Sequence, residues 1–179
     1  MSDGQSDVAP DEEAQGEGVP EPETRHGALV TRTFGDEVLH VERERWLEVV
    51  EALRDEGYTL CTDITAVDYL THTGRTLPAG VAPERFEVVA NLVSLEQRAR
   101  LRLRTQVPEG DPTVASLWGV HPGTEAGERE VYDMFGIAFD GHPDMTRILM
   151  PEDWEGHPLR KDYAVGEIPV AFKGTPGVR

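Results

Sequence analysis

The spacing of apolar residues predicts a helix early in the chain and a strand directly after it. Residues 41–57 carry four apolar side chains at the spacing i, i+3, i+4, i+7, which is typical of one helix face: Trp46, Val49, Val50 and Leu53. Gly57 stands where a glycine often ends a helix. Residues 58–70 are rich in Thr, Ile, Val and Tyr, a composition that favours a strand.

The clearest strand patterns lie in residues 85–95 and 98–107. The first run alternates so that one face is apolar: Phe86, Val88, Ala90 and Leu92. The second run places apolar residues on one face (Leu101, Leu103 and Val107) and arginines on the other: Arg98, Arg100, Arg102 and Arg104. A short turn around Glu96 and Gln97 would join the two runs as an antiparallel hairpin.

A second helix is predicted over residues 124–136. Thr124 is a candidate cap for its start and Gly136 for its end. Its inward face is expected to carry Val131, Met134 and Phe135. Residues 71–83 are rich in Gly and Pro, so we expect a loop there, and extended, turn-rich structure after Gly136.

Charge distinguishes the first 27 residues from the rest of the chain. Eight of the 34 acidic residues precede Arg25, where no Lys or Arg occurs: Asp3, Asp7, Asp11, Glu12, Glu13, Glu17, Glu21 and Glu23. Because few apolar residues accompany them, burial cannot offset the entropy lost on ordering, and we expect residues 1–27 to form a disordered acidic tail. The remainder is long enough for one domain with a core. Its charge is also negative, which argues against binding of duplex nucleic acid.

Cys61 is the only cysteine of the 179 residues. A single cysteine excludes a disulfide framework, and it excludes an iron–sulfur cluster or zinc finger held by cysteines of this chain alone. The acidic N-terminus lacks the apolar stretch of a secretory signal, and no run reaches the roughly 18 apolar residues of a membrane span. We therefore expect a protein that is soluble, or that reaches a membrane only through other chains.

The triplet Gly-His-Pro occurs twice, at residues 141–143 and 156–158, and has two interpretations. One is a metal site built from histidines and carboxylates, whose candidate ligands are His121, His142 and His157 with Glu125, Asp133 or Asp144. A stand-alone metallohydrolase using His121, His142 and Asp144 is the corresponding functional hypothesis. However, the histidines lack helical ligand spacing, and each precedes a proline, which restricts it to extended backbone. Turns with a hydrogen-bonding ring are the more economical interpretation.

The arginine row of residues 98–104 also has several interpretations. It resembles a phosphate ladder, a solvated sheet face neutralised by carboxylates such as Glu87, or a docking face. A docking face would receive an acidic partner or the chain's own acidic tail. The strongly acidic composition favours the last two interpretations over nucleic acid.

Other candidates for catalysis are few. Arg129 and Asp133 stand four residues apart on the second predicted helix, a spacing at which they could pair. Neither a phosphate-binding glycine loop nor a nucleophile elbow occurs. The residues alone therefore identify no catalytic site.

Residues 128–163 closely resemble the signature of the 30 kDa subunit family of respiratory complex I. The matching positions are Glu128-Arg129-Glu130, Asp133, Phe135-Gly136, Gly141-His142-Pro143, Arg147-Ile148-Leu149 and Gly156 through Tyr163. A weaker resemblance extends upstream to Leu29 and includes the Thr-Ala-Val-Asp-Tyr of residues 65–69. Ala126 departs from the family, which commonly has an aromatic residue there, and this puts a packing contact at the helix start in doubt.

The resemblance implies an α/β (α+β) fold, with a mixed or antiparallel sheet flanked by helices over residues 28–152. It implies that residues 153–179 form an extended C-terminal tail that docks on a partner subunit. The implied function is that of a non-catalytic structural subunit in the peripheral arm of a proton-translocating NADH:quinone oxidoreductase, a translocase. Equivalent subunits of membrane-bound hydrogenases or of deazaflavin-dependent dehydrogenases are the alternative.

The family carries no catalytic, cofactor-binding or metal-binding residue, so the resemblance implies no cofactor in this chain. Flavin, iron–sulfur clusters and the quinone site are expected in partner subunits. The expected partners are the quinone-site chain of the 49 kDa type and neighbouring iron–sulfur subunits. The expected location is peripheral, on the cytoplasmic side of the cell membrane.

The resemblance also implies which residues form the interface. These are Glu128, Arg129, Glu130, Asp133, Phe135, Gly136, His142, Pro143, Arg147, Gly156, His157, Pro158, Leu159, Arg160, Lys161, Asp162 and Tyr163. The prolines would reduce the entropy lost on docking, and Leu149, Met150, Trp154 and Leu159 would provide apolar anchors. We expect the chain from Glu155 onward to become ordered only on a partner, and Arg160→Ala to weaken assembly more than the fold.

Overall fold

The computed structural model describes residues 22–72 and 74–164. Its main element is a six-stranded sheet with the order β1-β2-β3-β6-β5-β4. The strands are β1 (Thr24–Arg25), β2 (Ala28–Thr33), β3 (Asp36–His40), β4 (Leu60–Asp68), β5 (Phe86–Ser94) and β6 (Ala99–Val107). All neighbours pair antiparallel except β3 and β6, which are parallel. The sheet is therefore mixed, as expected.

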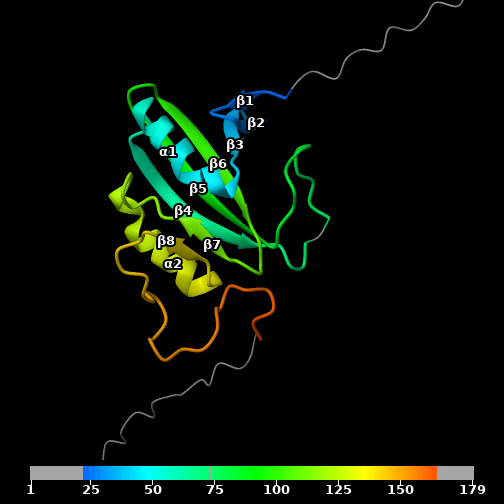
Figure 1. Cartoon of the computed structure of the whole chain (residues 1–179), viewed down its shortest axis with the longest axis vertical. Helices are drawn as coiled ribbons and strands as arrows, with labels where there is room; N and C mark the ends of the chain where they lie inside the picture. Colours follow the sequence, from blue (N-terminus) through cyan, green and yellow to red (C-terminus); the bar gives the residue numbers. More distant parts are fainter. Residues whose placement is uncertain (1–21, 73, 165–179) are drawn as a thin grey trace, which may run out of the picture.

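The remaining elements are two helices and a small second sheet (Figure 1). Helix α1 spans Trp46–Asp55 and helix α2 spans Glu125–Phe135, each preceded by a 3₁₀ turn. Strands β7 (Thr113–Ala115) and β8 (Ala138–Asp140) pair in parallel next to α2. These elements give the α+β class.

The predicted apolar stripes form the core. All four stripe residues of α1 are buried, and Gly57, whose φ is +99°, follows the C-terminal end of the helix. The inward residues of α2 are buried, and this helix approaches β4 so closely that a Cβ at Gly127 would lie 2.7 Å from Ile64 Cγ2. Each fully buried Leu or Val contributes roughly 1.5–3 kcal/mol relative to an exposed one. Both helices cover the sheet face that carries Ile64, and the arginines of β6 lie on the other face.

Strands β5 and β6 form the antiparallel hairpin that the alternating pattern predicted, with one correction. Phe86 pairs with Val107 and Ser94 with Ala99, so a four-residue turn joins the strands. Arg98 lies in that turn with φ +52° and is not part of the arginine row on the strand. The row therefore consists of Arg100, Arg102 and Arg104.

The hairpin of β2 and β3 was not predicted. Its strands are short, and its turn consists of Phe34 and Gly35 at φ +52° and +88° instead of the usual Asn-Gly. Residues 24–25 form β1, so the ordered domain begins before residue 28. This corrects the boundary of the expected acidic tail, whose residues 1–21 lie outside the described residues.

The start of α2 also differs from the prediction. Thr124 has helical backbone angles, and its side chain makes no capping bond to a backbone N–H group. Its hydroxyl instead donates to the Glu128 carboxylate at 2.9 Å. Gly136 ends the helix with φ +72°, as predicted.

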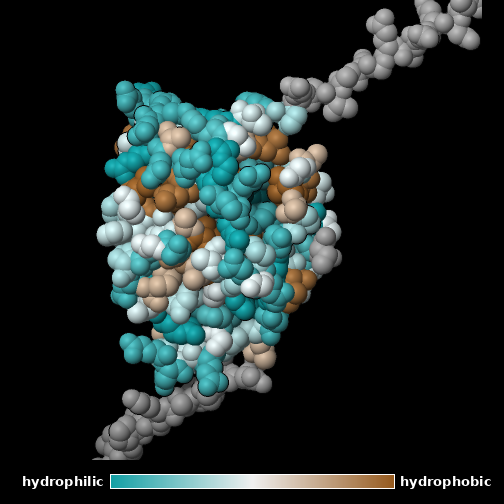
Figure 2. All heavy atoms as spheres, viewed as in Figure 1, coloured by the Kyte–Doolittle hydropathy of each residue, from teal (hydrophilic) through white to brown (hydrophobic). Residues whose placement is uncertain are grey.

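The surface is mainly hydrophilic. Figure 2 shows separate apolar areas on one face, surrounded by polar side chains. In the parts of the chain that the structure describes, no helix is long and apolar enough to cross a membrane.

Candidate functional site

The signature residues gather where the C-terminal segment (residues 141–163) folds back over the end of α2 (Figure 1). Three buried carboxylates organise this region: Asp133 and Glu128 on α2, and Asp68 at the end of β4. Asp133 and Asp68 bind the C-terminal segment directly, whereas Glu128 ties α2 to the chain before it.

Asp133 is fully buried and accepts four hydrogen bonds from the C-terminal segment. Arg147 donates to one carboxylate oxygen at 2.5 Å. Three successive backbone N–H groups, of Ile148, Leu149 and Met150, donate to the other oxygen at 3.1, 2.8 and 2.8 Å. Burial raises the pKa of Asp133, but the Met150 N–H, the Arg147 guanidinium and the other two N–H groups hold it below its ordinary value.

The predicted pair of Arg129 and Asp133 is wrong. Arg129 instead pairs with Glu125 at 3.3 Å, one helical turn earlier, and donates to Thr146 of the C-terminal segment. Asp133 faces inward and takes Arg147 as its partner at 2.5 Å. The two side chains therefore bind different parts of the same segment.

Glu128 is buried without an opposite charge within bonding distance. Its carboxylate accepts from the Ser116 hydroxyl at 2.5 Å, the Leu117 N–H at 2.7 Å and the Thr124 hydroxyl at 2.9 Å. Burial raises the pKa of Glu128, and these hydrogen bonds only partly counteract the shift. Glu130, the second glutamate of the signature, is exposed.

Asp68 holds the far end of the C-terminal segment. Arg85 forms a forked pair with it at 3.1 and 2.8 Å, and the Lys161 N–H donates to it at 2.9 Å. The same Arg85 side chain pairs with Asp162 at 2.7 Å. Burial raises the pKa of Asp68, but Arg85 and the Lys161 N–H bring it below its ordinary value. We did not predict the roles of Asp68 and Arg85; the only signal was the Asp of the Thr-Ala-Val-Asp-Tyr run.

Arg160 points inward. Its Nε donates to the carbonyl of Phe135 at 2.5 Å, and its guanidinium lies 5.2 Å from the centre of the Phe86 ring. The neighbouring Leu159 N–H donates to the carbonyl of Met134 at 3.0 Å. Residues 155–164 thus contact their own domain, and the expectation that the chain from Glu155 onward orders only on a partner stays a prediction. Residues 165–179 lie outside the described residues.

The two Gly-His-Pro histidines bind backbone groups of α2. His142 Nδ1 accepts from the Asp144 N–H at 3.1 Å, so its Nε2 donates to the carbonyl of Glu125 at 3.1 Å. His157 Nδ1 donates to the carbonyl of Asp133 at 3.0 Å. Burial lowers the pKa of His157, as do the nearby Arg160 and Arg147. These contacts match the turn-anchor interpretation of both triplets.

The metal-site interpretation finds no support in the described residues. His121 is buried, and burial lowers its pKa, as does Arg54. Both ring nitrogens of His142 are already hydrogen-bonded. Among residues 22–72 and 74–164, no group of three or more His, Cys, Asp or Glu side chains is arranged to hold a metal ion.

The outward side of the C-terminal segment carries exposed apolar side chains among charged ones. Ile148, Leu149 and Leu159 are exposed to 40%, 60% and 47%. The other predicted anchors, Met150 and Trp154, are half-buried. Of the remaining signature residues, Pro143 is exposed, whereas Pro158 and Tyr163 are half-buried. Tyr163 packs on Gly156, whose carbonyl accepts from Arg147 at 3.0 Å.

The arginine row divides into two parts. Arg104 pairs at 2.6 Å with Glu87, a buried carboxylate that also binds Arg75 at 3.2 Å. This confirms that Glu87 neutralises part of the row. Arg102 donates to the Asn91 side chain at 3.0 Å, and Arg100 lies 3.6 Å from Asp36.

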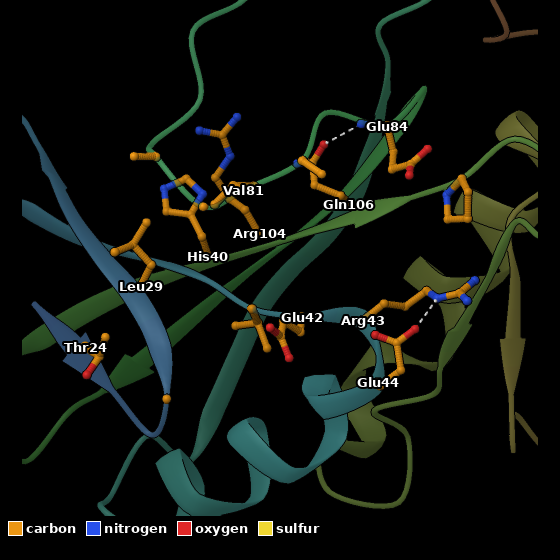
Figure 3. A pocket seen from close by; sticks show the side chains of 16 residues that line it. Thr24, Leu29, His40, Glu42, Arg43, Glu44, Val81, Glu84, Arg104 and Gln106 are labelled. Atoms are coloured by element: carbon orange, nitrogen blue, oxygen red, sulfur yellow. Dashed lines mark hydrogen bonds and ion pairs between the residues drawn. The ribbon is translucent and has the colours of Figure 1, made fainter. Parts of the chain in front are cut away.

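A hollow of about 630 Å³ lies beside strands β1, β2 and β3, and none of the signature residues lines it (Figure 3). Leu29, His40, Val81 and Arg104 are among the residues that line it. His40 Nε2 hydrogen-bonds the Thr31 hydroxyl at 3.0 Å, and burial lowers the pKa of His40, as does Arg104. We recognise no nucleophile with an adjacent base among these residues.

Comparison with known proteins identifies the chain's relatives. Residues 39–168 match the family described as respiratory-chain NADH dehydrogenase, 30 Kd subunit. The chain is 46% identical over 144 residues to the C subunit of NADH-quinone oxidoreductase from Salinispora arenicola, covering 79% of this chain and 55% of that protein. It is 48% identical over 140 residues to the corresponding protein of Mycobacterium ulcerans, covering 76% and 55%.

A solved structure, a trypsin-resistant fragment (1–134) of Nqo5, shares the fold. Its TM-score is 0.60 at 35% identity, covering 66% of this chain and 89% of that chain. The fold and the carboxylate-held C-terminal segment thus define a small α+β domain. The chain belongs to the 30 kDa subunit family of respiratory-chain NADH dehydrogenase. It spans about 55% of the length of the two curated relatives described above.

Proposed function

We propose that this chain is a non-catalytic structural subunit in the peripheral arm of a proton-translocating NADH:quinone oxidoreductase. Its contribution to electron transfer from NADH to quinone is indirect, because it holds the quinone-site subunits in position. The observation that carries this proposal is the family match over residues 39–168, which includes strands β4, β5 and β6 and the C-terminal segment. The two NADH-quinone oxidoreductase relatives at 46% and 48% identity support it.

The docking surface we propose is the outward side of the C-terminal segment. Two of its arginines are used internally: Arg147 binds Asp133 of α2, and Arg160 binds the Phe135 carbonyl. Apolar side chains remain outward among exposed acids such as Glu152 and Glu155, and Leu149 and Leu159 are the most exposed of the apolar ones. Exposed apolar side chains on a rigid segment are suitable anchors, because little entropy is lost when they are buried on a partner.

We propose that the partner at this surface is the quinone-site chain of the 49 kDa type, with iron–sulfur subunits beside it. Flavin, iron–sulfur clusters and the quinone site then belong to partner subunits, and this chain holds no cofactor. The assembly places the chain at the cytoplasmic side of the membrane, attached only through other subunits.

An affinity pull-down from gently solubilised membranes tests the proposal. The tagged chain is expected to recover NADH:quinone oxidoreductase subunits together with NADH:quinone activity. Recovery of hydrogenase or deazaflavin-dehydrogenase subunits would show that the chain belongs to a complex with a different electron donor. Recovery of the chain alone would refute the proposal.

The surface is tested with Leu149→Glu, which is expected to reduce the recovered complex about tenfold. Leu60→Glu is the matched control, because Leu60 is exposed to 43% on β4, away from this segment. Unfolding of each purified variant shows whether the fold is intact. If both variants assemble equally well, the C-terminal segment is not the docking surface.

A further inference from the structure

Two hairpin turns lie at the same end of the sheet. Because β3 and β6 are parallel and Glu37 pairs with Leu101, the turn before β3 lies next to the turn before β6. The first turn carries Phe34, which is fully exposed, and the second carries Leu95, exposed to 70%. We call this surface the arginine end; it consists of Phe34, Leu95, Arg98, Arg100 and Arg102.

The arginine end carries three arginines against two nearby acids, Asp36 and Glu96, although the whole chain has a net charge of −17. A hollow of about 350 Å³ lies there on the open face of the sheet, lined by Phe34, Val93, Arg100 and Arg102 among others. Asp36 is the one carboxylate among the residues that line it. Its distance to Arg100 is 3.6 Å, and the Arg100 side chain is exposed to 73%.

Phe34 indicates that the arginine end is a contact surface. A bulky side chain at φ +52° is strained, and Asn or Gly is usual at this position of a two-residue turn. A non-glycine residue in this conformation lowers the free energy of unfolding by on the order of 1 kcal/mol. Its ring is fully exposed, so packing within the described chain does not compensate for the strain.

The path of the chain at its first described residues leads toward this surface. Thr24 pairs with Leu29 and Arg25 with Ala28, and the Val30 N–H donates to the carbonyl of Glu23 at 2.8 Å. Read toward the N-terminus, the chain therefore runs along β2 in the direction of Phe34. Glu23 already forms a forked pair with Arg32 at 2.5 and 2.8 Å.

We propose that residues 1–21 bind back onto the arginine end. In the same register Val19 would lie opposite Phe34, and Pro20 and Pro22 are tolerated because β1 is an edge strand. To reach Arg100, the acids before Val19 would then cross three strand spacings, about 14 Å. Residues 1–21 hold seven acids and no base: Asp3, Asp7, Asp11, Glu12, Glu13, Glu17 and Glu21.

The occupant is a segment of the same chain because attachment raises its effective concentration to the millimolar range. Exposed ion pairs contribute only about 0.2–1 kcal/mol each, so several must act together. Such binding is sensitive to salt, because exposed charges are screened over about 10 Å at 0.1 M. This proposal does not depend on the proposed function, since it concerns the isolated chain.

The experiment compares the full chain with a variant in which all seven acids are replaced by the corresponding amides. Arginines are modified with phenylglyoxal at low salt, and the modified sites are mapped by mass spectrometry. Arg100 and Arg102 are expected to react about threefold more slowly in the unmodified sequence than in the variant. Arg54 is the internal control, because it is exposed and belongs to α1, which covers the sheet face opposite to the one that carries Arg100 and Arg102. The difference should vanish at about 0.5 M salt.

Each other outcome overturns the proposal. Equal rates in the two chains would show that the segment does not cover the arginine end. An equal change at Arg54 would show a general effect of net charge instead of a bound segment. Protection of Arg100 and Arg102 only after assembly with other subunits would show that a partner chain is the occupant.

Discussion

At the scale of single residues, the C-terminal segment depends most on Asp133. This buried carboxylate accepts three successive backbone N–H groups and one guanidinium, all from the segment. We identified Asp133 in the sequence but predicted the wrong partner. The spacing of side chains does not show which backbone N–H groups donate to a carboxylate. Arg147, fourteen residues away, offers no helical spacing that would identify it.

Asp133→Asn is expected to lower the free energy of unfolding by roughly 3 kcal/mol, because it leaves Arg147 half-buried without its carboxylate. The amide nitrogen would also face N–H donors that need an acceptor. Urea unfolding of the purified chain measures the change. Glu130→Gln is the control, since Glu130 is exposed on the same helix; similar losses in both variants would contradict the assigned role.

At the scale of elements, the sequence predicted α1, β4, the β5–β6 hairpin and α2 because each has a long, regular apolar pattern. It missed β1, β2 and β3, whose strands have two to six residues, and the β2–β3 turn uses Phe-Gly. In the candidate site, the histidine turns were predictable from His-Pro. The contacts of Asp68 and Arg160 were not, because they join residues far apart in the chain.

Gly136 lets the C-terminal segment pack closely against the end of α2. Its φ is +72°, and a Cβ there would lie 2.5 Å from the His157 ring and 2.7 Å from Arg160. Gly141 has φ +84° with open space around it. Both Gly→Ala substitutions carry a backbone penalty of about 1 kcal/mol, but only Gly136→Ala also displaces the C-terminal segment. Urea unfolding should therefore show the larger loss for Gly136→Ala; equal losses would mean that the His157 contact is unimportant.

The Arg160 side chain contacts its own domain, so we expect it to contribute to the stability of the isolated chain. From its contacts to Phe135 and Phe86, we expect Arg160→Ala to lower the stability of the isolated chain by about 1–2 kcal/mol. This replaces the expectation that mainly assembly suffers. Hydrogen exchange should increase at the Leu159 and Lys161 amides, which donate to Met134 and Asp68.

Lys161→Ala is the control for Arg160→Ala, because the Lys161 residue is exposed and contributes its backbone N–H to Asp68. Both variants remove one positive charge from neighbouring positions. Unchanged exchange at Leu159 in Arg160→Ala would restore the original expectation that the side chain serves an interface.

At the scale of the whole molecule, the C-terminal segment is attached through two carboxylates whose pKa values are lowered on folding, Asp68 and Asp133. A carboxyl with a lower pKa in the folded chain stabilises the fold above its ordinary pKa of about 4. That contribution is lost as the pH falls through the lowered value. The core sheet is held mainly by apolar burial, which does not change with protonation.

Acid should therefore release the C-terminal segment before the sheet unfolds. Pepsin digestion at decreasing pH, with cleavage sites mapped by mass spectrometry, should show cuts in residues 141–163 at a higher pH than cuts in β5 or β6. Because each digest reports both regions, the comparison is independent of how pepsin activity changes with pH. Asp133→Asn should move the first cuts toward neutral pH, since one of the two carboxylates is already absent. Simultaneous cleavage of segment and hairpin would instead show that both form one cooperative unit, and that the two carboxylates stabilise the whole domain.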